Sequence, residues 1–303
     1  PYTQWKRRRG LEIRKAVYPD DTGNGSTALE DFIQKQYDSN DILYVVLAGD
    51  AEQIPVASTS PNPTDNLYSL VSGDDLYHDV LISRMPAADS DELTTMVNKI
   101  IQYEKFPGQK EDLSWYNEVL FVGSDEGASD SSTGLADKEI LQQEKDFFLA
   151  NGFSLVTEVY DPDAAKDDVT NAWNDGRNIL YYLGHGAETT WRTTGLGVAD
   201  VNDSLQNGSA LPFVINGNCA NGNFTREYGD CLAEAMLKAN GPDSPAGAVA
   251  VAASTTDMDW DPPIWMITTY PKDTDGEGMT YYLTKDEVPP AGAMTIFSVQ
   301  DSM

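Results

Sequence analysis

The feature that most constrains this chain is a repeated alternation between short apolar runs and segments with apolar residues at helical spacing. The short runs predict strands over residues 11–17, 42–48, 67–71, 80–83, 118–123, 154–160, 178–183, 211–216 and 247–253. The other segments predict helices over residues 27–37, 89–103, 137–151, 164–175 and 231–239, with Asp89 or Ser90 capping the second. Strands and helices that alternate in this way form an α/β fold, in which helices cover both faces of a mainly parallel sheet.

A polar segment over residues 106–114 interrupts this pattern, and it contains the turn-forming pair Pro107-Gly108. We therefore expect an N-terminal lobe over residues 1–112 and a C-terminal lobe over residues 113–303, a division that suits a chain of 303 residues. In the first lobe, the nearly continuous apolar run over residues 42–48 is typical of a central strand buried on both faces.

The charge of the chain excludes one large class of partners. Lys and Arg number 20 against 49 Asp and Glu, which gives a net charge of −29. Nucleic-acid binding depends on basic residues that displace counterions, so we expect no nucleic-acid partner. No run of 18 apolar residues predicts a membrane span. The excess of carboxylates is typical of a secreted or salt-adapted protein, or of one that binds hard cations.

Two predicted strands end in glycine-rich turns that carry reactive side chains. His185 lies between Gly184 and Gly186, directly after the strand over residues 178–183. Cys219 follows the strand over residues 211–216 in an equally tight turn. If the two strands are neighbours, the imidazole and the thiol meet at one edge of the sheet. A cysteine nucleophile needs such a base, together with backbone N–H groups that hold an oxyanion.

Other interpretations of these side chains stay open on the residues alone. A cysteine in a loop of small residues is often a packing residue, and a lone histidine often has only a structural role. A zinc site would need Cys231 as well, because the chain has only two histidines. Cys219 and Cys231 lie twelve positions apart and form either one disulfide or free thiols.

The motifs around His185 and Cys219 resemble those of a known family. Residues 184–191 (GHGAETTW) and 217–224 (GNCANGNF) resemble the His and Cys motifs of the gingipain family of cysteine peptidases. Further segments resemble the family in the same order: residues 5–11, 44–54, 73–84, 160–162, 231–236 and 253–263. The resemblance covers nearly the whole chain and points to the arginine-specific gingipains.

The resemblance implies a three-layer α/β/α, caspase-like fold with two lobes, each built on a mainly parallel sheet flanked by helices. It also implies a secreted endopeptidase that acts outside the cell on protein or peptide substrates, and it predicts no oligomeric state. Three differences from the family are expected. The first strand of the N-terminal lobe is absent, residues 264–303 match poorly, and no immunoglobulin-like domain follows.

The roles of individual residues are implied by the same resemblance. Cys219 is expected to attack the scissile carbonyl, and His185 to protonate the leaving amine. Glu126 is expected to orient the imidazole, and the backbone N–H groups of Gly186 and Cys219 to hold the oxyanion. Without the resemblance, Glu126 is simply one of many acidic residues on a solvated loop, and Cys231 is a buried structural thiol.

Asp137 and Trp260 match residues that line the family's pocket for the side chain before the scissile bond. A buried carboxylate can bind a planar guanidinium through two hydrogen bonds, and an indole can cover its plane. The resemblance therefore implies cleavage after a basic residue, with Arg preferred over Lys. Without it, Asp137 is a favourable residue at a helix N-terminus, and Trp260 is a packing residue.

A calcium site is predicted in the first lobe. Asp75 and Asp79 lie on one side of an extended segment, and Asp50 ends a predicted strand that could face them. The resemblance implies that a structural Ca²⁺ binds Asp50, Asp75, Asp79 and the backbone carbonyls of Ser72 and Tyr77, because Ca²⁺ prefers oxygen ligands. The alternative is that residues 73–75 form only a turn between two strands.

Two other functions compete with the peptidase interpretation. A catalytically silent relative would serve as a binding or surface module, although it would have no need of an intact Cys219 and His185. A metal-dependent hydrolase would use the acidic clusters instead of the thiol. Labelling of Cys219 by a peptidyl electrophile separates the first from a peptidase, and immediate loss of turnover on chelation identifies the second.

Overall fold

Five parallel strands between residues 118 and 253 form the main sheet, in the order β4-β3-β5-β8-β9. The computed structural model describes residues 1–59, 62–105, 113–241 and 244–267. The strands are β3 (Glu118–Gly123), β4 (Leu155–Tyr160), β5 (Ile179–Leu183), β8 (Phe213–Gly217) and β9 (Ala250–Ala253). Each lies within a few residues of a strand predicted from the apolar runs, so the pattern predicted this sheet well.

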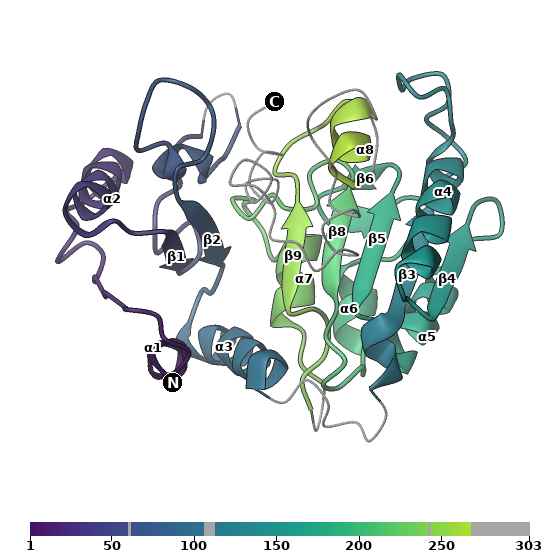
Figure 1. The fold of residues 1–303 in the computed structure, drawn as a ribbon, viewed down its shortest axis with the longest axis horizontal. Coiled ribbons are helices and arrows are strands. Elements are labelled where there is room, and N and C mark those ends of the chain that lie inside the picture. The colour runs from purple at the N-terminus through teal and green to yellow at the C-terminus, as the bar shows by residue number, and fades with distance from the viewer. Residues whose placement is uncertain (60–61, 106–112, 242–243, 268–303) are drawn as a thin grey trace.

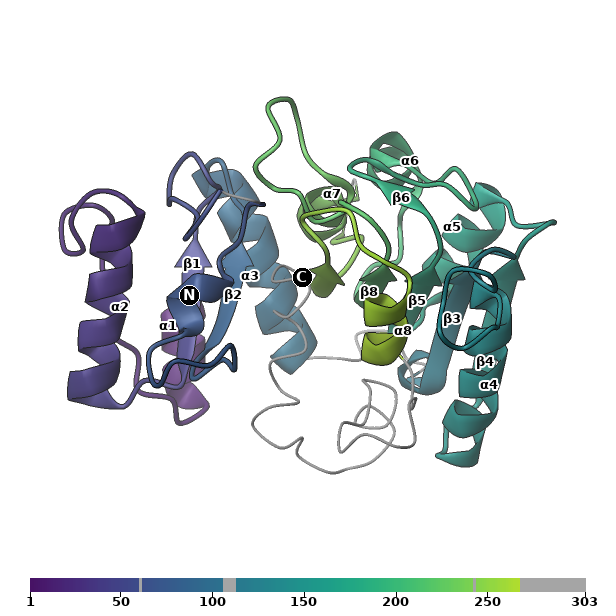
Figure 2. The same cartoon turned by 90° about the horizontal axis from the view of Figure 1, so that it is seen from above.

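Helices cover both faces of this sheet, as Figure 2 shows. One face packs against α5 (Lys166–Asp175), α6 (Val198–Ser204) and α7 (Leu232–Lys238) through a cluster that includes Trp173, Val201 and Met236. The other face packs against α4 (Asp137–Ala150) and α8 (Asp261–Ile267). The predicted three-layer α/β/α arrangement is therefore confirmed.

The middle strand β5 explains why the two faces carry different aromatic clusters. All of its residues are buried, as expected of a parallel strand with helices on both sides. Tyr181 stacks on Phe121 on the side of α4, with ring centroids 5.4 Å apart. Tyr182 stacks on Trp191 on the opposite side, with centroids 4.5 Å apart. Successive side chains of β5 point to opposite faces of the sheet, so this one strand contributes a tyrosine to each of the two aromatic clusters.

The first lobe has a smaller sheet, in which β1 (Tyr44–Ala48) pairs in parallel with β2 (Leu81–Met85). The helix α2 (Ser26–Asn40) packs its buried side chains onto this pair (Figure 1), and α3 (Ser90–Lys105) follows β2. Asp89 caps α3 by accepting hydrogen bonds from two backbone N–H groups of its first turn. A short helix, α1 (Tyr2–Arg8), packs against α3.

Two strand predictions in the first lobe were wrong, and a third gave the right position but the wrong burial. Residues 11–17 have no regular secondary structure, and Leu11 and Val17 are 42% and 59% exposed, so no neighbouring strand covers them. Residues 67–71 fall largely in a 3₁₀ helix (Asn66–Ser69), where the Ser69 hydroxyl donates to the Asn66 carbonyl and so competes with strand pairing. The run over residues 42–48 is not buried on both faces either, because β1 is an edge strand within the described residues.

The two lobes meet between α3 and α7. Lys99 of α3 is almost fully buried, and its Nζ donates to the backbone carbonyls of Met236 (3.2 Å) and Leu237 (2.7 Å) in the last turn of α7. These carbonyls have no partner within the helix, so Lys99 caps α7 from the other lobe. Burial lowers the pKa of Lys99 to about 7. The predicted boundary, residues 106–114, lies mostly outside the described residues and stays a prediction.

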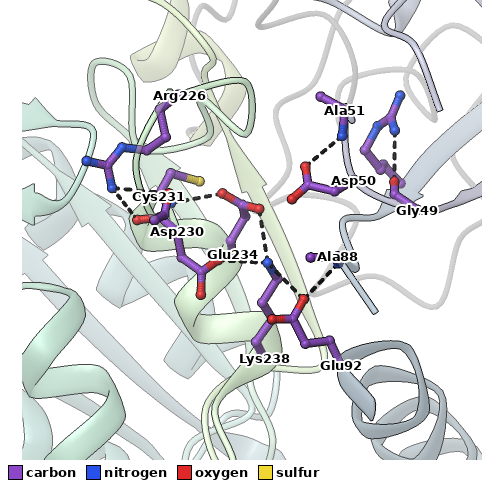
Figure 3. Close-up of polar contacts among 12 residues, drawn as sticks. Gly49, Asp50, Ala51, Ala88, Glu92, Arg226, Asp230, Cys231, Glu234 and Lys238 are labelled. Atoms are coloured by element: carbon purple, nitrogen blue, oxygen red, sulfur yellow. Dashed lines mark hydrogen bonds and ion pairs between the residues drawn. The ribbon is translucent and has the colours of Figure 1, made fainter. Parts of the chain in front are cut away.

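A second polar contact joins the same two helices. Lys238 of α7 binds Glu92 of α3 (3.2 Å) as well as Asp230 (2.7 Å) and Glu234 (3.3 Å) of its own lobe (Figure 3). Burial lowers the pKa of Lys238, but the three surrounding carboxylates together outweigh it, so the pKa is raised. The cation therefore links the lobes at a position that is shielded from solvent. No helix among the described residues is long and apolar enough to cross a membrane.

Candidate active site

The pairing of β5 with β8 brings the two predicted reactive turns together. The last residue of β5, Leu183, lies opposite Gly217, the last residue of β8. Because parallel strands point the same way, both following turns leave the same edge of the sheet. His185 and Cys219 line one open cavity at this edge, and Met258, Asp259 and Trp260 complete its wall. The condition set by the sequence, that the two strands be neighbours, is therefore met.

The loop that carries Cys219 is supported by the segment after β9. The Cys219 Sγ accepts a hydrogen bond from the Met258 N–H (3.4 Å) and contacts its carbonyl (3.7 Å). The next residue, Ala220, has a positive φ of 55°, a conformation that few non-glycine residues adopt, and its N–H donates to the Thr256 carbonyl (2.9 Å). Such strain is common at functional sites, where it fixes the position of a reactive side chain.

The imidazole of His185 has a carboxylate partner. Its Nε2 lies 3.1 Å from Glu126 Oε2, so the predicted orienting residue reaches the ring. Both side chains are about half exposed, at 48% and 57%, so solvent weakens the attraction between them. The indole of Trp260 packs edge-on against the imidazole, with centroids 4.7 Å apart. The Tyr182 hydroxyl donates to the His185 carbonyl (2.6 Å), which fixes the backbone.

Asp137 is fully buried beneath this site. Its Oδ2 accepts from the Ser124 hydroxyl (2.6 Å), and its Oδ1 accepts from Trp260 Nε1 (2.8 Å). Burial raises the pKa of Asp137 to about 6, although the two hydrogen bonds partly oppose the shift. Asp137 and Trp260, 123 positions apart, therefore belong to one polar cluster.

The turn at Gly127 can accommodate only glycine. Its φ is +93°, and a Cβ built there would lie 2.2 Å from Trp260 Nε1 and 2.9 Å from Asp137 Oδ1. Any side chain at this position would displace the indole from the carboxylate. Because Gly127 directly follows Glu126, the same turn places the partner of His185 and lies against the hydrogen bond between Trp260 and Asp137.

The two residues predicted to hold an oxyanion lie in contact. A Cβ at Gly186 would come within 2.7 Å of the Cys219 carbonyl oxygen and 2.8 Å of Asn218 Cγ. Glycine is therefore required for the His185 loop to lie directly on the Cys219 loop. Within the described residues, the backbone N–H of Cys219 has no hydrogen-bond acceptor. Its role as an oxyanion donor stays a prediction.

The expected calcium ligands are not gathered into one site. Asp79 Oδ2 accepts from the N–H groups of Val71 (2.9 Å) and Ser72 (2.8 Å), and Asp75 Oδ1 accepts from the Tyr77 N–H (2.8 Å). These bonds organise the turn itself. No three carboxylate, imidazole or thiol groups in the described ranges are placed to hold a metal together.

Asp50 lies apart from that turn, with its side chain pointing across the lobe interface toward Glu234 (Figure 3). Burial is the main cause of the raised pKa of Glu234, and the nearby Asp50 charge adds to it. The residues as placed therefore do not form the six to eight oxygen ligands that Ca²⁺ takes, and calcium binding stays a prediction.

The cysteines are both free in the structure, so the disulfide alternative is not formed. Cys231 is fully buried and precedes α7, as expected of a structural thiol, and burial raises its pKa well above the usual value. The thiol of Cys219 is partly exposed at the cavity, so only this one is accessible to a substrate.

Sequence reasoning missed the residues that support the site. Met258 contacts the thiol only through its backbone, which leaves no signal in the residue type. Ser124 binds Asp137 and begins the Ser-Asp-Glu-Gly turn, so its place beside Glu126 could have indicated it. Asn218 and Asn221 flank Cys219 within its own motif, but the motif does not reveal what their side chains contact.

At the carboxyl edge of a parallel sheet, a partly exposed thiol and an imidazole with a carboxylate partner line one cavity. These are the groups that a cysteine peptidase needs. The profile of peptidase family C25 matches residues 1–294, and the chain belongs to this family. The family expected from the sequence motifs is therefore confirmed.

Individual relatives agree with this assignment. Gingipain R2 of Porphyromonas gingivalis is 30% identical over 266 residues, which cover 87% of this chain and 36% of the relative. A Lys-gingipain of the same organism is 25% identical over 270 residues, covering 86% of this chain and 15% of the relative. The chain therefore spans about a third or less of the length of these curated relatives.

Solved structures are also similar. The crystal structure of the Arg-specific cysteine proteinase gingipain R (RgpB) has a TM-score of 0.82 and 29% identity, covering 87% of this chain and 61% of that chain. A complex of the Porphyromonas gingivalis RgpB pro- and mature domains has a TM-score of 0.87 and 27% identity, covering 98% and 69%. The fold of this chain is therefore the gingipain fold.

We predict that Gly127→Ala lowers the free energy of unfolding by about 2–4 kcal/mol. The substitution strains a left-handed backbone and also forces Trp260 away from Asp137, which leaves a buried carboxylate with one partner fewer. Gly134→Ala is the matched control, because Gly134 also has a positive φ (+68°) but has no atom within 4 Å of its Cβ position. It should lose only about 1–2 kcal/mol. Urea denaturation of both variants measures the difference, and equal losses would contradict the contact.

Proposed function

We propose that this chain is a cysteine endopeptidase that cleaves peptide bonds after arginine. The observation that carries the proposal is the convergence of Cys219 and His185 on one cavity. Glu126 contacts the imidazole, and the buried carboxylate of Asp137 holds Trp260, which lines the same cavity. Membership of family C25 and the similarity to the Arg-specific gingipain R support it. The chain spans only part of these relatives, so the activity, the substrates and any partner belong to the proposal.

In the proposed reaction, the Cys219 thiolate attacks the scissile carbonyl carbon and forms a tetrahedral intermediate. The N–H groups of Gly186 and Cys219 stabilise its oxyanion. His185 then protonates the leaving amine, and the C–N bond breaks to leave a thioester on Cys219. A water molecule, deprotonated by His185, hydrolyses the thioester and restores the thiol. In the structure the thiol contacts Met258 and the imidazole contacts Glu126. Catalytic groups of a free enzyme need not contact each other, because their hydrogen bonds often tighten only when substrate binds.

The specificity in this proposal comes from Asp137 and Trp260. A guanidinium placed over Asp137 would add donors to a carboxylate that already binds Ser124 and Trp260. Each carboxylate oxygen accepts more than one hydrogen bond, so the existing partners need not leave. The indole, held by its hydrogen bond to Asp137, is positioned to cover the apolar stem of an arginine side chain.

The proposal is tested by comparing the parent with Cys219→Ala and His185→Ala on a fluorogenic arginine peptide. Cys219→Ala should abolish cleavage without changing the unfolding midpoint, because the partly exposed thiol contributes little to the core. His185→Ala should lower kcat by about three orders of magnitude or more, since the leaving amine loses its acid. Cleavage that survives in Cys219→Ala but stops on chelation would instead identify a metal-dependent hydrolase. No cleavage and no labelling of the parent by an arginyl electrophile would identify a silent binding module.

We predict that the preference for arginine weakens below about pH 6. The folded pKa of Asp137 is about 6, above its ordinary value of 3.8, so the carboxyl gains a proton as the pH falls through that range. Only the ionised form attracts a guanidinium, and about one tenth of it remains at pH 5. The ratio of kcat/KM for an arginine peptide to that for the neutral citrulline analogue should therefore fall about tenfold between pH 8 and pH 5. In Asp137→Asn the ratio should be low and independent of pH; a constant ratio in the parent would contradict the pocket.

We also propose, from the family resemblance alone, a structural calcium ion in the first lobe, with Asp50, Asp75, Asp79 and the backbone carbonyls of Ser72 and Tyr77 as its ligands. An ion bound only by the folded chain raises stability by mass action, so chelation should lower the Tm by several degrees. Asp75→Ala with Asp79→Ala should remove this response, whereas Asp20→Ala, an exposed carboxylate elsewhere in the lobe, should keep it. A Tm that is the same with and without calcium in the parent would overturn the site.

The setting of this activity is proposed on the same basis. The resemblance to gingipains supports a secreted or cell-surface peptidase that acts on extracellular proteins or peptides. RgpB forms a complex of pro- and mature domains, so a separate pro-domain is the partner that the proposal favours. N-terminal sequencing of the protein isolated from its native source tests both points, because a processed chain in the culture fluid is the expected result.

A further inference from the structure

We propose that Asn221, together with Asn218, is a positioning pair that holds the Cys219 loop on the His185 loop. The inference rests on the proposed function, because it assigns to two asparagines the placement of the thiol relative to the imidazole. Asn221 does not line the cavity, and Asn218, which does, has its side-chain amide bonded to Asn221. Their effect is exerted through the loops that carry the two reactive groups.

The contacts of Asn221 bridge the two loops directly. Its side chain is fully buried, and its Nδ2 donates to the backbone carbonyls of Ala187 and Thr190 (3.4 Å to the latter), on either side of the turn after His185. Its Oδ1 accepts from Asn218 Nδ2 at 2.5 Å. The reverse amide orientation would point an oxygen at two carbonyl oxygens, so the hydrogen bonds fix the assignment.

Asn218 precedes Cys219 and is itself 3% exposed. Its Nδ2 is committed to Asn221, while its Oδ1 has no hydrogen-bond partner among the described residues. A buried oxygen without a hydrogen bond lowers the free energy of unfolding, so Asn218 destabilises the fold through its Oδ1 atom. The geometry that it maintains is the close approach of Gly186 to the Cys219 carbonyl.

Both loops are also attached to the beginning of α7. The Leu232 N–H donates to the Glu188 carbonyl of the His185 loop (2.8 Å), and the Ala233 N–H donates to the Asn221 carbonyl of the Cys219 loop (3.0 Å). The side chain of Asn221 therefore joins two loops whose backbones share one anchor. The contacts that reach the imidazole and the thiol themselves do not join the two loops, because Glu126 binds the imidazole and the backbone of Met258 binds the thiol.

Asn221→Asp tests the pair with almost no change of shape. The new carboxylate oxygen would face the carbonyls of Ala187 and Thr190, which repel it. At low pH the carboxyl is protonated, and its O–H can donate to one of these carbonyls. The defect should therefore be large at high pH and should diminish as the pH falls.

Asn207 provides a matched control at the opposite end of the sheet. It is also buried, its Nδ2 donates to the carbonyls of Ala210 (2.6 Å) and Gly247 (2.9 Å), and its Oδ1 accepts from the Gly247 N–H (2.8 Å). Asn207→Asp therefore creates the same repulsion before β8 begins, far from the reactive turns. It should lower stability, with the same pH dependence, without changing catalysis.

The experiment compares the parent, Asn221→Asp and Asn207→Asp in the full chain. We expect Asn221→Asp to lower kcat at least 100-fold at pH 8, with KM changed less than threefold, and to recover at least tenfold relative to the parent at pH 5.5. Asn207→Asp should keep kcat within twofold of the parent at both pH values, at a similar loss of stability in urea. Equal kcat in the two variants would overturn the inference.

A second readout does not depend on turnover. The rate at which iodoacetamide alkylates a cysteine depends on how accessible the thiol is and on which groups lie beside it. Asn221→Ala, which adds no charge, should slow alkylation at pH 6 at least fivefold, and mass spectrometry separates Cys219 from the buried Cys231. If Asn221→Ala does not fold, Asn218→Ala removes the bond between the pair and the Cγ atom against which Gly186 lies, and it should slow alkylation at least twofold. If the variant is alkylated as fast as the parent, the inference is overturned, even if the parent cleaves peptides. If the variant is alkylated more slowly but the parent cleaves no peptide, only the proposed function is refuted.

Discussion

The site depends on one constraint, the parallel register in which Leu183 of β5 lies opposite Gly217 of β8. That register makes two strands, separated by a long crossover, end at the same level. The turns that carry His185 and Cys219 therefore start side by side, and glycine at position 186 allows them to touch. A shift of one residue would rotate every side chain of a strand to the other face and would break both aromatic layers as well as the site. Packing of the core and placement of the reactive groups are thus one property of the sheet.

The sequence predicted a strand correctly where other elements of the fold cover that strand. Each strand of the main sheet was predicted, because helices on both faces require an apolar run such as that of β5. In the first lobe the same pattern misled. The run in β1 is apolar, yet Tyr44 is 54% exposed, and residues 11–17 form no strand. A run of apolar residues favours burial, but the run itself does not show whether another strand or helix packs against it.

The residues of the site also differ in how far the sequence could predict them. His185 and Cys219 could be found from the residues, because glycine-rich turns after strands leave a visible pattern. Glu126, Asp137 and Trp260 required the family resemblance, since a carboxylate on a loop or at a helix start has many ordinary explanations. Met258 could not be found at all, because a backbone N–H group holds the thiol and every residue except proline has one.

The contact between Cys219 and Met258 has a consequence for the time at which the site is completed during synthesis. The two residues are 39 positions apart, and a ribosome adds about 5–20 residues per second. For several seconds, a nascent chain therefore carries the nucleophile and the imidazole without Met258 or the indole of Trp260 that close the cavity. The reactive pair is made early and the walls that shape a substrate's approach are made late.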